Sequence, residues 1–292
     1  MPWLQLIIHS TRAQASAIEE ALMDVGAASV TLQDDADQPI LEPALGETPL
    51  WDATRITGLF EADINTKAVS LELLAQLPQE PLNLKWEQLE DKDWEREWMA
   101  SFQPICCGER LWICPSWKEP PEPEAVNLML DPGLAFGTGT HPTTFLCLQW
   151  LDQQSLEQAA LVDFGCGSGI LGIAALLLGA KQVIGVDIDP QALLATRENA
   201  GRNGLAADAM PVFLPKDAPQ TSVDIMLANI LAGPLVELAP LLTSQVRASG
   251  LLCLSGILAS QADAVMSAYP AFDFDPVAQK EEWVRLTGRK VR

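Results

Sequence analysis

The hydrophobic pattern of the first ninety residues predicts a small mixed α+β domain. Apolar and β-branched residues gather in short runs typical of strands, and two longer stretches repeat apolar positions at helical spacing, the first closed by Gly26. The predicted elements are, in order, a strand over 3–9, a helix over 14–25, strands over 28–33 and 58–62, a helix over 67–77 and a strand over 82–87. This order is typical of a ferredoxin-like sandwich, a scaffold that many unrelated functions share.

The pattern changes in the second half of the chain, where continuous apolar runs of strand length alternate with helical stretches. The clearest elements are a strand over 160–164, a helix from 170 that ends at Gly179, a strand over 182–186, a helix over 191–203 and a strand over 222–228. Asp189 and Pro190 supply an N-cap and a first-turn proline for the second of these helices. Such alternation predicts an open α/β sheet that binds its ligands at the carboxyl ends of the strands.

A charged stretch connects the two patterns. Trp94, Trp98 and Phe102 are four residues apart, so on a helix their rings share one face. The simpler interpretation is that this stripe packs on the core of one domain. The alternative is a connecting helix whose aromatic face lets the domains take more than one relative orientation. We therefore expect three parts: a ferredoxin-like domain over 1–89, an interdomain helix over 90–104 and the α/β domain over 105–292.

The charge balance narrows the class of partners. The 292 residues, a length that fits two domains, include 39 Asp and Glu against 18 Lys and Arg, a formal net charge of −21. Such a field repels the phosphates of a long nucleic acid and attracts basic proteins or amines. Residues 1–90 hold 15 acidic and 4 basic residues, a net charge of −11. This part is a candidate docking face for a basic partner, with a solvated acidic surface as the alternative.

Signals for export, membrane insertion and metal binding are absent from the sequence. The first residues carry no secretory signal, and the longest apolar stretch, 225–242, is interrupted by Asn229, Glu237 and two prolines. The six cysteines form no C-x-x-C pair, and His9 and His141 are the only histidines. We expect a soluble, cytoplasmic protein with reduced thiols, no membrane contact and no metal.

The candidate chemistry begins in the turn after the strand over 160–164. Segment 163–169 reads Asp-Phe-Gly-Cys-Gly-Ser-Gly, and glycines at alternate positions let the backbone turn sharply and let a ligand come close. Asp187 follows the next strand, 18 residues after Gly169, near the spacing at which a carboxylate reaches ribose hydroxyls. Segment 167–172 also fits the dinucleotide pattern G-x-G-x-x-G, so an NAD-dependent dehydrogenase is an alternative.

Three further features bear on these alternatives. Asp163 lies at the end of its strand, where a carboxylate would repel a pyrophosphate but could accept hydrogen bonds from an ammonium group such as that of S-adenosylmethionine. Segment 229–231, Asn-Ile-Leu, lies at the carboxyl edge of the strand over 222–228, where open α/β sheets bind ligands. A glycine- and threonine-rich loop over 131–144 precedes the first strand of the sheet.

Segment 163–169 resembles the first motif of class I S-adenosylmethionine-dependent methyltransferases. Together with segments 136–144, 229–234 and 254–258, it is similar to the bacterial family that methylates the eleventh protein of the large ribosomal subunit, and the resemblance covers essentially the whole chain. The resemblance implies a seven-stranded Rossmann-like sheet, mostly parallel with one antiparallel strand. It also implies that the smaller N-terminal domain recognises the ribosomal protein.

The resemblance implies that four residues contact S-adenosylmethionine: Thr144, Gly165, Asp187 and Asn229. The glycine motif adds Asp163 and Gly167 to the expected cofactor site. The chemistry of the residues agrees, because Gly165 leaves room for the methionine part, Asp187 can accept hydrogen bonds from the ribose, and Thr144 offers a hydroxyl at the rim.

Asn229 is also the expected catalytic residue, in a positioning role. Its side chain can present an amide and a carbonyl to both cofactor and acceptor, but it cannot act as a base. His141 is a candidate proton acceptor, with a structural loop histidine as the alternative. Asp217 is a weaker candidate for the adenine amino edge, with a solvated loop acid as the alternative.

The implied reaction is transfer of methyl groups from S-adenosylmethionine to lysine side-chain and N-terminal amines of that basic ribosomal protein, to trimethylated products. The enzyme would act chiefly by holding amine and sulfonium close and aligned. The alternatives are a methyltransferase of another protein or of RNA, the dehydrogenase, or a non-enzymatic binding module. Amino-group DNA methyltransferases usually carry Asn-Pro-Pro-Tyr where segment 229–232 reads Asn-Ile-Leu-Ala, and DNA would meet a strongly negative protein.

Overall fold

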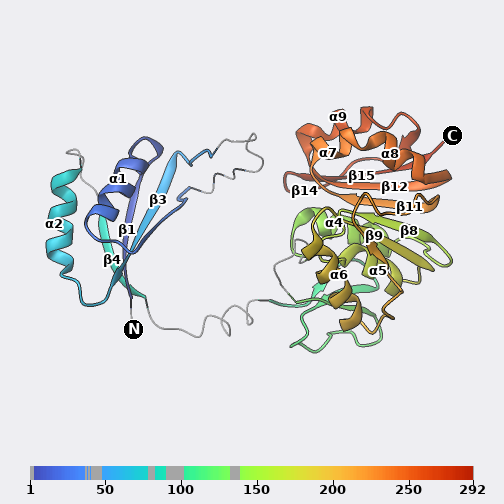
Figure 1. Ribbon diagram of the computed structural model, residues 1–292, viewed down its shortest axis with the longest axis horizontal. Coiled ribbons are helices and arrows are strands. Elements are labelled where there is room, and N and C mark those ends of the chain that lie inside the picture. The colour runs from blue at the N-terminus through green and yellow to red at the C-terminus, as the bar shows by residue number, and fades with distance from the viewer. Residues whose placement is uncertain are drawn as a thin grey trace. The chain divides into compact units, whose positions relative to one another are not determined.

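The computed structural model describes residues 3–36, 38, 40, 48–77, 83–89, 102–131 and 139–291. The chain divides into two compact units, Met1–Met99 and Ala100–Arg292 (Figure 1). Two parts of the sequence predictions lie outside the described residues: Trp94 and Trp98 of the aromatic stripe, and residues 132–138 of the glycine- and threonine-rich loop.

The N-terminal unit is a four-stranded sheet with two helices. Its elements are β1 (Trp3–Thr11), α1 (Arg12–Asp24), β2 (Ser29–Asp34), β3 (Ala53–Glu61), α2 (Thr66–Gln76) and β4 (Leu84–Leu89). The strand order is β2-β3-β1-β4, and every neighbouring pair is antiparallel. The order of strands and helices that the sequence predicts for this part of the chain is therefore confirmed.

Alternating burial along the two central strands builds the core of this unit. Leu6 on β1 and Ile56 and Phe60 on β3 are completely buried, and they share one core with Leu22 of α1. Strand β3 begins at Ala53, five residues before the predicted strand over 58–62. The sequence did not predict residues 53–57 as strand, because threonine and arginine interrupt the apolar pattern there.

One mixed sheet forms the centre of the C-terminal unit. Among the described residues it has eight strands: β8 (Ala160–Phe164), β9 (Gln182–Val186), β10 (Val212–Phe213), β11 (Val223–Asn229), β12 (Val246–Leu258), β13 (Phe272–Phe274), β14 (Ala278–Lys280) and β15 (Trp283–Lys290). The order is β10-β9-β8-β11-β12-β15-β13, with β14 beside β15. The first five strands are parallel, and β15 is antiparallel to β12, β13 and β14.

The described sheet therefore differs from the expected seven strands by one short strand. β14 has three residues, Ala-Gln-Lys, and pairs with the start of β15. Its polar sequence carries no hydrophobic period, so the sequence gives no strand signal there. The strand forms because Glu281, at φ 57°, turns the backbone sharply enough for the two segments to pair.

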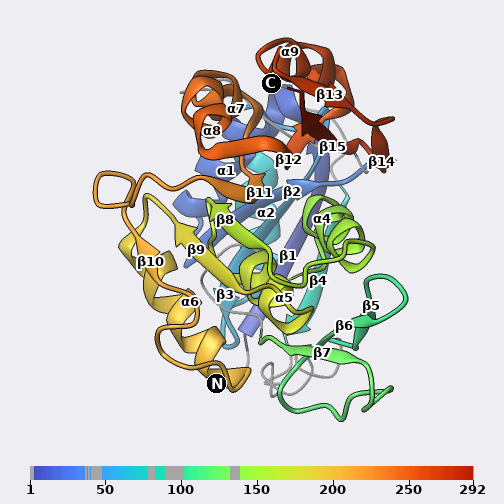
Figure 2. The same cartoon turned by 90° about the vertical axis from the view of Figure 1, so that its right-hand side faces the viewer.

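Helices cover both faces of this sheet (Figures 1 and 2). On one face lie α4 (Pro142–Asp152), α5 (Ile170–Leu177) and α6 (Pro190–Arg202), and on the other lie α7 (Ala232–Glu237), α8 (Ala239–Gln245) and, after the 3₁₀ turn η1 (Ala259–Gln261), α9 (Ala262–Ser267). Successive residues of β11 face opposite sides: Met226 belongs to the core under α7–α9 and Leu227 to the core under α4–α6. A strand buried on both faces is a continuous apolar run, which is why its position was predictable.

A small second sheet completes the C-terminal unit. It consists of β5 (Ile105–Cys106), β6 (Leu111–Cys114) and β7 (Val126–Met129), in that order, with β6 and β7 parallel. Leu111, Ile113 and Leu128 join the core under α4–α6. The end of β7 thereby fixes the point from which the chain enters the loop over 131–144.

Replacing Gly256 with alanine should destabilise the C-terminal unit. The residue has φ 81°, in the left-handed region, and a Cβ would clash with the backbone oxygen of Ile230, next to the pairing of Asn229 with Ser255. We expect Gly256→Ala to lower the free energy of unfolding by about 1–3 kcal/mol through backbone strain, measured by urea denaturation.

The matched control is Gly233→Ala, since no heavy atom lies within 4 Å of the position that its Cβ would take. Gly233 lies within α7, where alanine is favoured over glycine by up to about 1 kcal/mol. Equal unfolding midpoints for the two variants would show that the approach of Ile230 to Gly256 places no constraint on the backbone.

Candidate active site

A cavity of about 350 Å³ opens at the carboxyl ends of β8, β9 and β11. The chain first leaves β8 for β9 and β10 on one side and later returns to β11 and β12 on the other, so the strand order reverses between β8 and β11. Open α/β sheets bind ligands at such a reversal, because the loops that leave the two strands diverge and leave a crevice.

All six residues of the predicted cofactor site line this cavity: Thr144, Asp163, Gly165, Gly167, Asp187 and Asn229. They come from separate elements: α4, the end of β8, the turn after β8, the residue after β9 and the end of β11. Sequence reasoning missed the apolar part of the lining, which includes Ile188, Pro215 and Leu231. Ile188 and Leu231 are 83% and 56% exposed.

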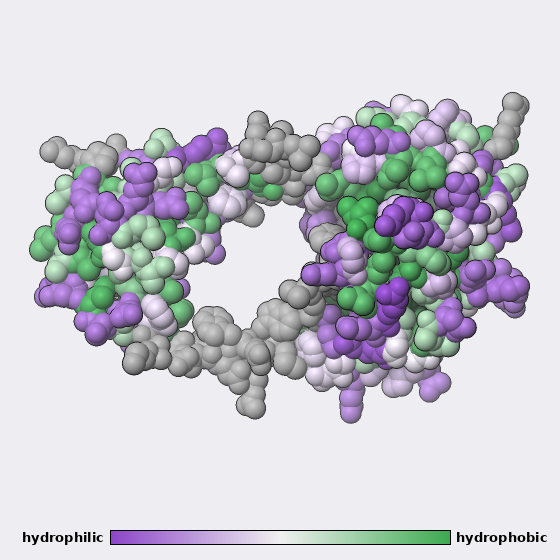
Figure 3. Space-filling model, viewed as in Figure 1, coloured by the Kyte–Doolittle hydropathy of each residue, from purple (hydrophilic) through white to green (hydrophobic). Residues whose placement is uncertain are grey.

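The sequence did contain a signal for this apolar lining. Ile188 directly follows Asp187, and Leu231 comes two residues after Asn229. Figure 3 shows apolar side chains gathered on the face of the C-terminal unit that is in view. Exposed apolar side chains at the mouth of a cavity suit a flat, weakly polar group of a ligand.

The glycine turn after β8 folds back over the next strand. The backbone N–H groups of Gly165 and Cys166 donate to the carbonyl oxygen of Val186, at 2.7 and 3.1 Å. Gly165 has φ 76°, and a Cβ there would clash with the side chain of Ile230. The turn therefore needs glycine both for its backbone angle and for the close approach of the segment after β11.

Asp187 is fixed in orientation by two backbone groups. Its Oδ2 accepts a hydrogen bond from the N–H of Gly167 at 2.8 Å, and its Oδ1 accepts one from the N–H of Asp189 at 3.0 Å. The carboxylate is half-buried at the cavity wall. Each oxygen retains a lone pair, so the carboxylate can accept further hydrogen bonds from a ligand diol.

Asp163 is buried and bound to the helix behind the turn. Its Oδ2 accepts a hydrogen bond from the N–H of Gly172 in α5 at 2.9 Å. Burial raises the pKa of Asp163 to about 7, the Gly172 hydrogen bond lowers it, and the nearby charge of Asp187 raises it. The bond to α5 gives this carboxyl a structural role, and its expected contact with an ammonium group stays a prediction.

Asn229 and Thr144 meet across the cavity although they are 85 positions apart in the sequence. The Nδ2 of Asn229 donates to the Oγ1 of Thr144 at 3.3 Å. The Oδ1 of Asn229 is buried and has no hydrogen-bond partner among the described residues. A buried acceptor left open in this way costs free energy, and an incoming N–H group would satisfy it.

His141 and Asp217 are not among the residues that line the cavity. His141 is the N-cap of α4: its Nδ1 accepts from the backbone N–H of Thr143 at 3.4 Å, and its ring packs edge-on against Trp283 with centroids 4.9 Å apart. Burial lowers the pKa of His141, and the charge of Glu281 opposes that shift. These contacts favour the structural alternative for His141. Asp217 is an exposed loop acid.

The electrostatics of the cavity favour a cationic ligand. None of the described residues that line it is a lysine or an arginine, whereas Asp163 and Asp187 contribute carboxyl groups. A pyrophosphate would meet these carboxyl groups without a counter-charge, and a sulfonium or ammonium group would be attracted to them. The lining therefore fits S-adenosylmethionine better than a dinucleotide.

Within the described ranges, no group of three or more His, Cys, Asp or Glu side chains is arranged to hold a metal ion. All six cysteines are free thiols. No helix in the described part of the chain is long and apolar enough to cross a bilayer.

The chain is similar to proteins of one family along its whole length. The family model described as Ribosomal protein L11 methyltransferase matches residues 2–291. The proteins of that name from Cellvibrio japonicus and Saccharophagus degradans are 67% and 60% identical, covering 100% and 99% of this chain and 100% of each relative. The crystal structure of a ribosomal protein L11 methylase from Lactobacillus delbrueckii subsp. bulgaricus matches with a TM-score of 0.60 and 32% identity, over 65% of this chain and 100% of that chain.

Asp163 should make the stability of the C-terminal unit depend on pH. Because its pKa rises from 3.8 when unfolded to about 7 when folded, the folded state holds the proton more tightly, and the free energy of unfolding falls as pH rises from about 4 to 7. Asp163→Asn has no charge to desolvate. We expect its stability relative to wild type to increase across this window by up to about 4 kcal/mol, in urea denaturation at several pH values.

The matched control is Asp217→Asn, at an exposed carboxylate of the same unit. A difference between Asp163→Asn and wild type that stays constant from pH 4 to pH 8 would mean that burial does not hold the proton on this carboxyl group.

Proposed function

The chain belongs to the ribosomal protein L11 methyltransferase family, and on that premise we propose that it moves methyl groups from S-adenosylmethionine to lysine side-chain and N-terminal amines of ribosomal protein L11, to trimethylated products. It is an S-adenosylmethionine-dependent methyltransferase that acts on a ribosomal protein. The identity of the acceptor amines and the number of methyl groups belong to the proposal.

The observation that carries the proposal is the open acceptor on Asn229. Among the described residues its Oδ1 is buried without a hydrogen-bond partner, its Nδ2 is held by Thr144, and Asn229 lines the cavity. An amine that donates an N–H to this oxygen is oriented by the hydrogen bond. The lone pair of the amine nitrogen is then free to point elsewhere in the cavity. Asn229 therefore positions the acceptor, and because an amide takes up no proton at neutral pH, it does not act as a base.

The residues of the cavity fit the cofactor. S-adenosylmethionine supplies a methyl group on a positively charged sulfur and carries no phosphate. We infer that Asp187 holds the ribose hydroxyls, that Gly165 and Gly167 admit the methionine part, and that Thr144 lies at the rim. Asp163 would add negative charge near the ammonium group. The absence of lysine and arginine from the described lining supports this assignment over an NAD-dependent dehydrogenase.

The acceptor amine must lose a proton before it can attack. A lysine amine has a reference pKa of about 10.4, and a cation nearby lowers that value because two positive charges repel each other. The described lining residues include no histidine or lysine, so we propose that the proton leaves to water through the mouth of the cavity. Repeated transfer requires that the spent, demethylated cofactor be exchanged for a fresh molecule and that the mono- or dimethylated amine lose a proton in the same way.

We further propose that the N-terminal unit is a ferredoxin-like domain that recognises the substrate. Its strand order β2-β3-β1-β4 supports that fold, and the net charge of −11 over residues 1–90 supports a basic partner, since opposite charges speed encounter. Ribosomal proteins are mostly basic, whereas nucleic acids would be repelled. The proposal places the enzyme in the cytoplasm, where ribosomal proteins are made, without membrane contact.

Methyl transfer to isolated L11 tests the function and the role of Asn229 together. Purified L11 from cells that lack this enzyme is incubated with labelled S-adenosylmethionine, and label is identified by amino-acid hydrolysis. We expect label in methylated lysine and at the N-terminal amine. Asn229→Ala should lower kcat at saturating cofactor by about 100-fold, since a misplaced acceptor loses alignment.

Asn127→Ala is the matched control, because Asn127 lies on β7 and is not among the residues that line the cavity: it donates to the backbone carbonyls of Glu122 and Ala125 and accepts from the thiol of Cys114. Absence of label from L11 would overturn the substrate assignment. Undiminished kcat in Asn229→Ala would overturn the positioning role.

Removal of residues 1–89 should separate cofactor binding from substrate recognition. All the described residues that line the cavity belong to the C-terminal unit, so the truncated chain should bind S-adenosylmethionine within about twofold of the full chain. We expect its methylation of L11 to fall below about 1% of wild type, which corresponds to loss of roughly 3 kcal/mol of recognition. Calorimetry and the label assay measure the two quantities. Full activity of the truncated chain would show that recognition lies elsewhere.

A further inference from the structure

One face of α6 contacts two segments, the glycine turn after β8 and the end of β7. We call this the α6 polar face: Thr196, Asn199, Arg202 and Asn203. Thr196, Asn199 and Asn203 lie at helical spacing, so they share one side of the helix. Thr196 is completely buried and Asn199 is 7% exposed. None of the four lines the cavity.

The first half of the polar face holds the glycine turn from behind. Oγ1 of Thr196 donates to the carbonyl oxygen of Gly167 at 3.0 Å, and Nδ2 of Asn199 donates to the carbonyl oxygen of Ser168 at 2.8 Å. From the other side, Asp187 accepts from the N–H of Gly167. The position of the turn at the cavity wall is therefore set by side chains in front of it and behind it.

The second half of the polar face holds the entrance to the loop over 131–144. Asn203 binds Met129 at both backbone groups: Oδ1 accepts from its N–H at 2.7 Å, and Nδ2 donates to its carbonyl oxygen at 2.8 Å. Arg202 forms an ion pair with Asp131, with Nε and Oδ2 3.5 Å apart. Asp131 also accepts from the N–H and the hydroxyl of Ser116, at 2.7 and 2.8 Å.

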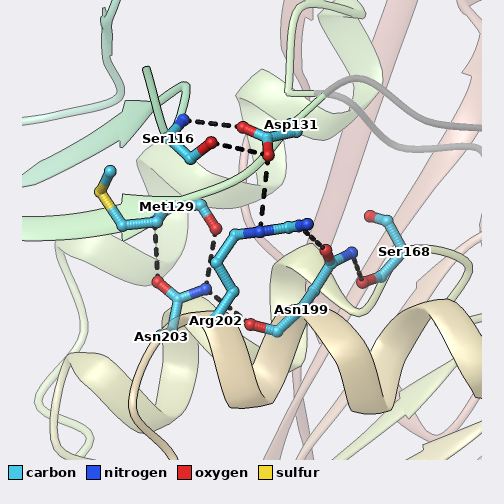
Figure 4. Close-up of polar contacts among 7 residues, drawn as sticks. All are labelled: Ser116, Met129, Asp131, Ser168, Asn199, Arg202 and Asn203. Carbon is cyan, nitrogen blue, oxygen red and sulfur yellow. Dashed lines mark hydrogen bonds and ion pairs between the residues drawn. The ribbon is translucent and has the colours of Figure 1, made fainter. Parts of the chain in front are cut away.

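Figure 4 shows that the two halves form one network. Nη1 of Arg202 donates to Oδ1 of Asn199 at 2.6 Å, so the same asparagine that holds Ser168 is tied to the arginine that holds Asp131. The glycine turn and the end of β7 are thus attached to one helix.

We propose that the α6 polar face is a positioning device: Asn199 sets the affinity for S-adenosylmethionine by holding the glycine turn, whereas Asn203 holds the end of β7 and has no effect on that affinity. The inference rests on the proposed function. Both are positioning residues, since neither borders the cavity.

Asn199→Asp tests the role of Asn199. A carboxylate still accepts from Arg202 but cannot donate to the carbonyl oxygen of Ser168, which it would instead repel. We expect calorimetry to give a Kd for S-adenosylmethionine about tenfold higher than wild type, the size of one lost buried hydrogen bond, while kcat at saturating cofactor stays within about twofold. If this variant does not fold, Thr196→Val removes the donor to Gly167 with little change of shape and should raise the Kd in the same direction.

Asn203→Ala tests the role of Asn203. It removes both hydrogen bonds to Met129 but leaves the bonds of Thr196 and Asn199 to the glycine turn, so we expect the cofactor Kd to stay within about twofold of wild type. Glu198→Gln, at an exposed position of the same helix, is the matched control and should behave as wild type in both assays.

A raised Kd in Asn199→Asp beside a wild-type Kd in Asn203→Ala is expected only if the network works as proposed. General weakening of the fold would raise the Kd in both asparagine variants, and that result would overturn the proposal, as would wild-type values for both. The binding measurement needs no acceptor. Unlabelled L11 with wild-type enzyme would therefore refute the proposed function, while a raised Kd in Asn199→Asp would still support the role of the turn.

Discussion

The site depends on how the backbone N–H and carbonyl groups of the glycine turn after β8 are hydrogen-bonded. The N–H groups of Gly165 and Cys166 bond to the strand beside them, the N–H of Gly167 bonds to Asp187, and carbonyl oxygens of the turn bond to α6. Because buried backbone groups must be paired, these hydrogen bonds fix the position of the turn relative to β9 and α6. The cavity is defined by that position, because the segment after β11 packs directly against Gly165.

The carboxyl groups at the cavity wall explain why a glycine turn that fits the dinucleotide pattern need not bind a dinucleotide. A buried carboxyl group at the end of β8 would be costly if ionised, and burial raises the pKa of Asp163 to about 7, which lets the group stay partly protonated until a positive charge arrives. Asp187 adds a carboxylate at the same wall, and no described lining residue supplies a compensating cation. The same two carboxyl groups that make a phosphate unfavourable therefore make a sulfonium favourable.

The sequence predicted the strands next to the cavity and the polar residues at their carboxyl ends, because both follow from a local hydrophobic pattern. The strands around Asp163, Asp187 and Asn229 are buried on both faces, so their apolar runs and carboxyl ends could be read directly, and all six predicted cofactor residues line one cavity. Prediction failed where the signal is not local. The pairing of β14 depends on a turn at Glu281, and the role of Asn199 depends on a carbonyl oxygen 31 positions earlier. A polar residue in a helix carries no sign of which backbone group it will meet.

The contact between Thr144 and Asn229 follows from the same topology. Thr144 lies in the first turn of α4, before the first strand of the sheet, and Asn229 ends β11, yet the reversal of strand order brings both to one edge. Since Thr144 holds the Nδ2 of Asn229, the side chain cannot rotate to exchange its amide ends without losing that bond, and its Oδ1 remains directed away from Thr144. An acceptor held by that oxygen is positioned by the fold itself, so a change that shifts α4 should affect methyl transfer even though it touches neither substrate.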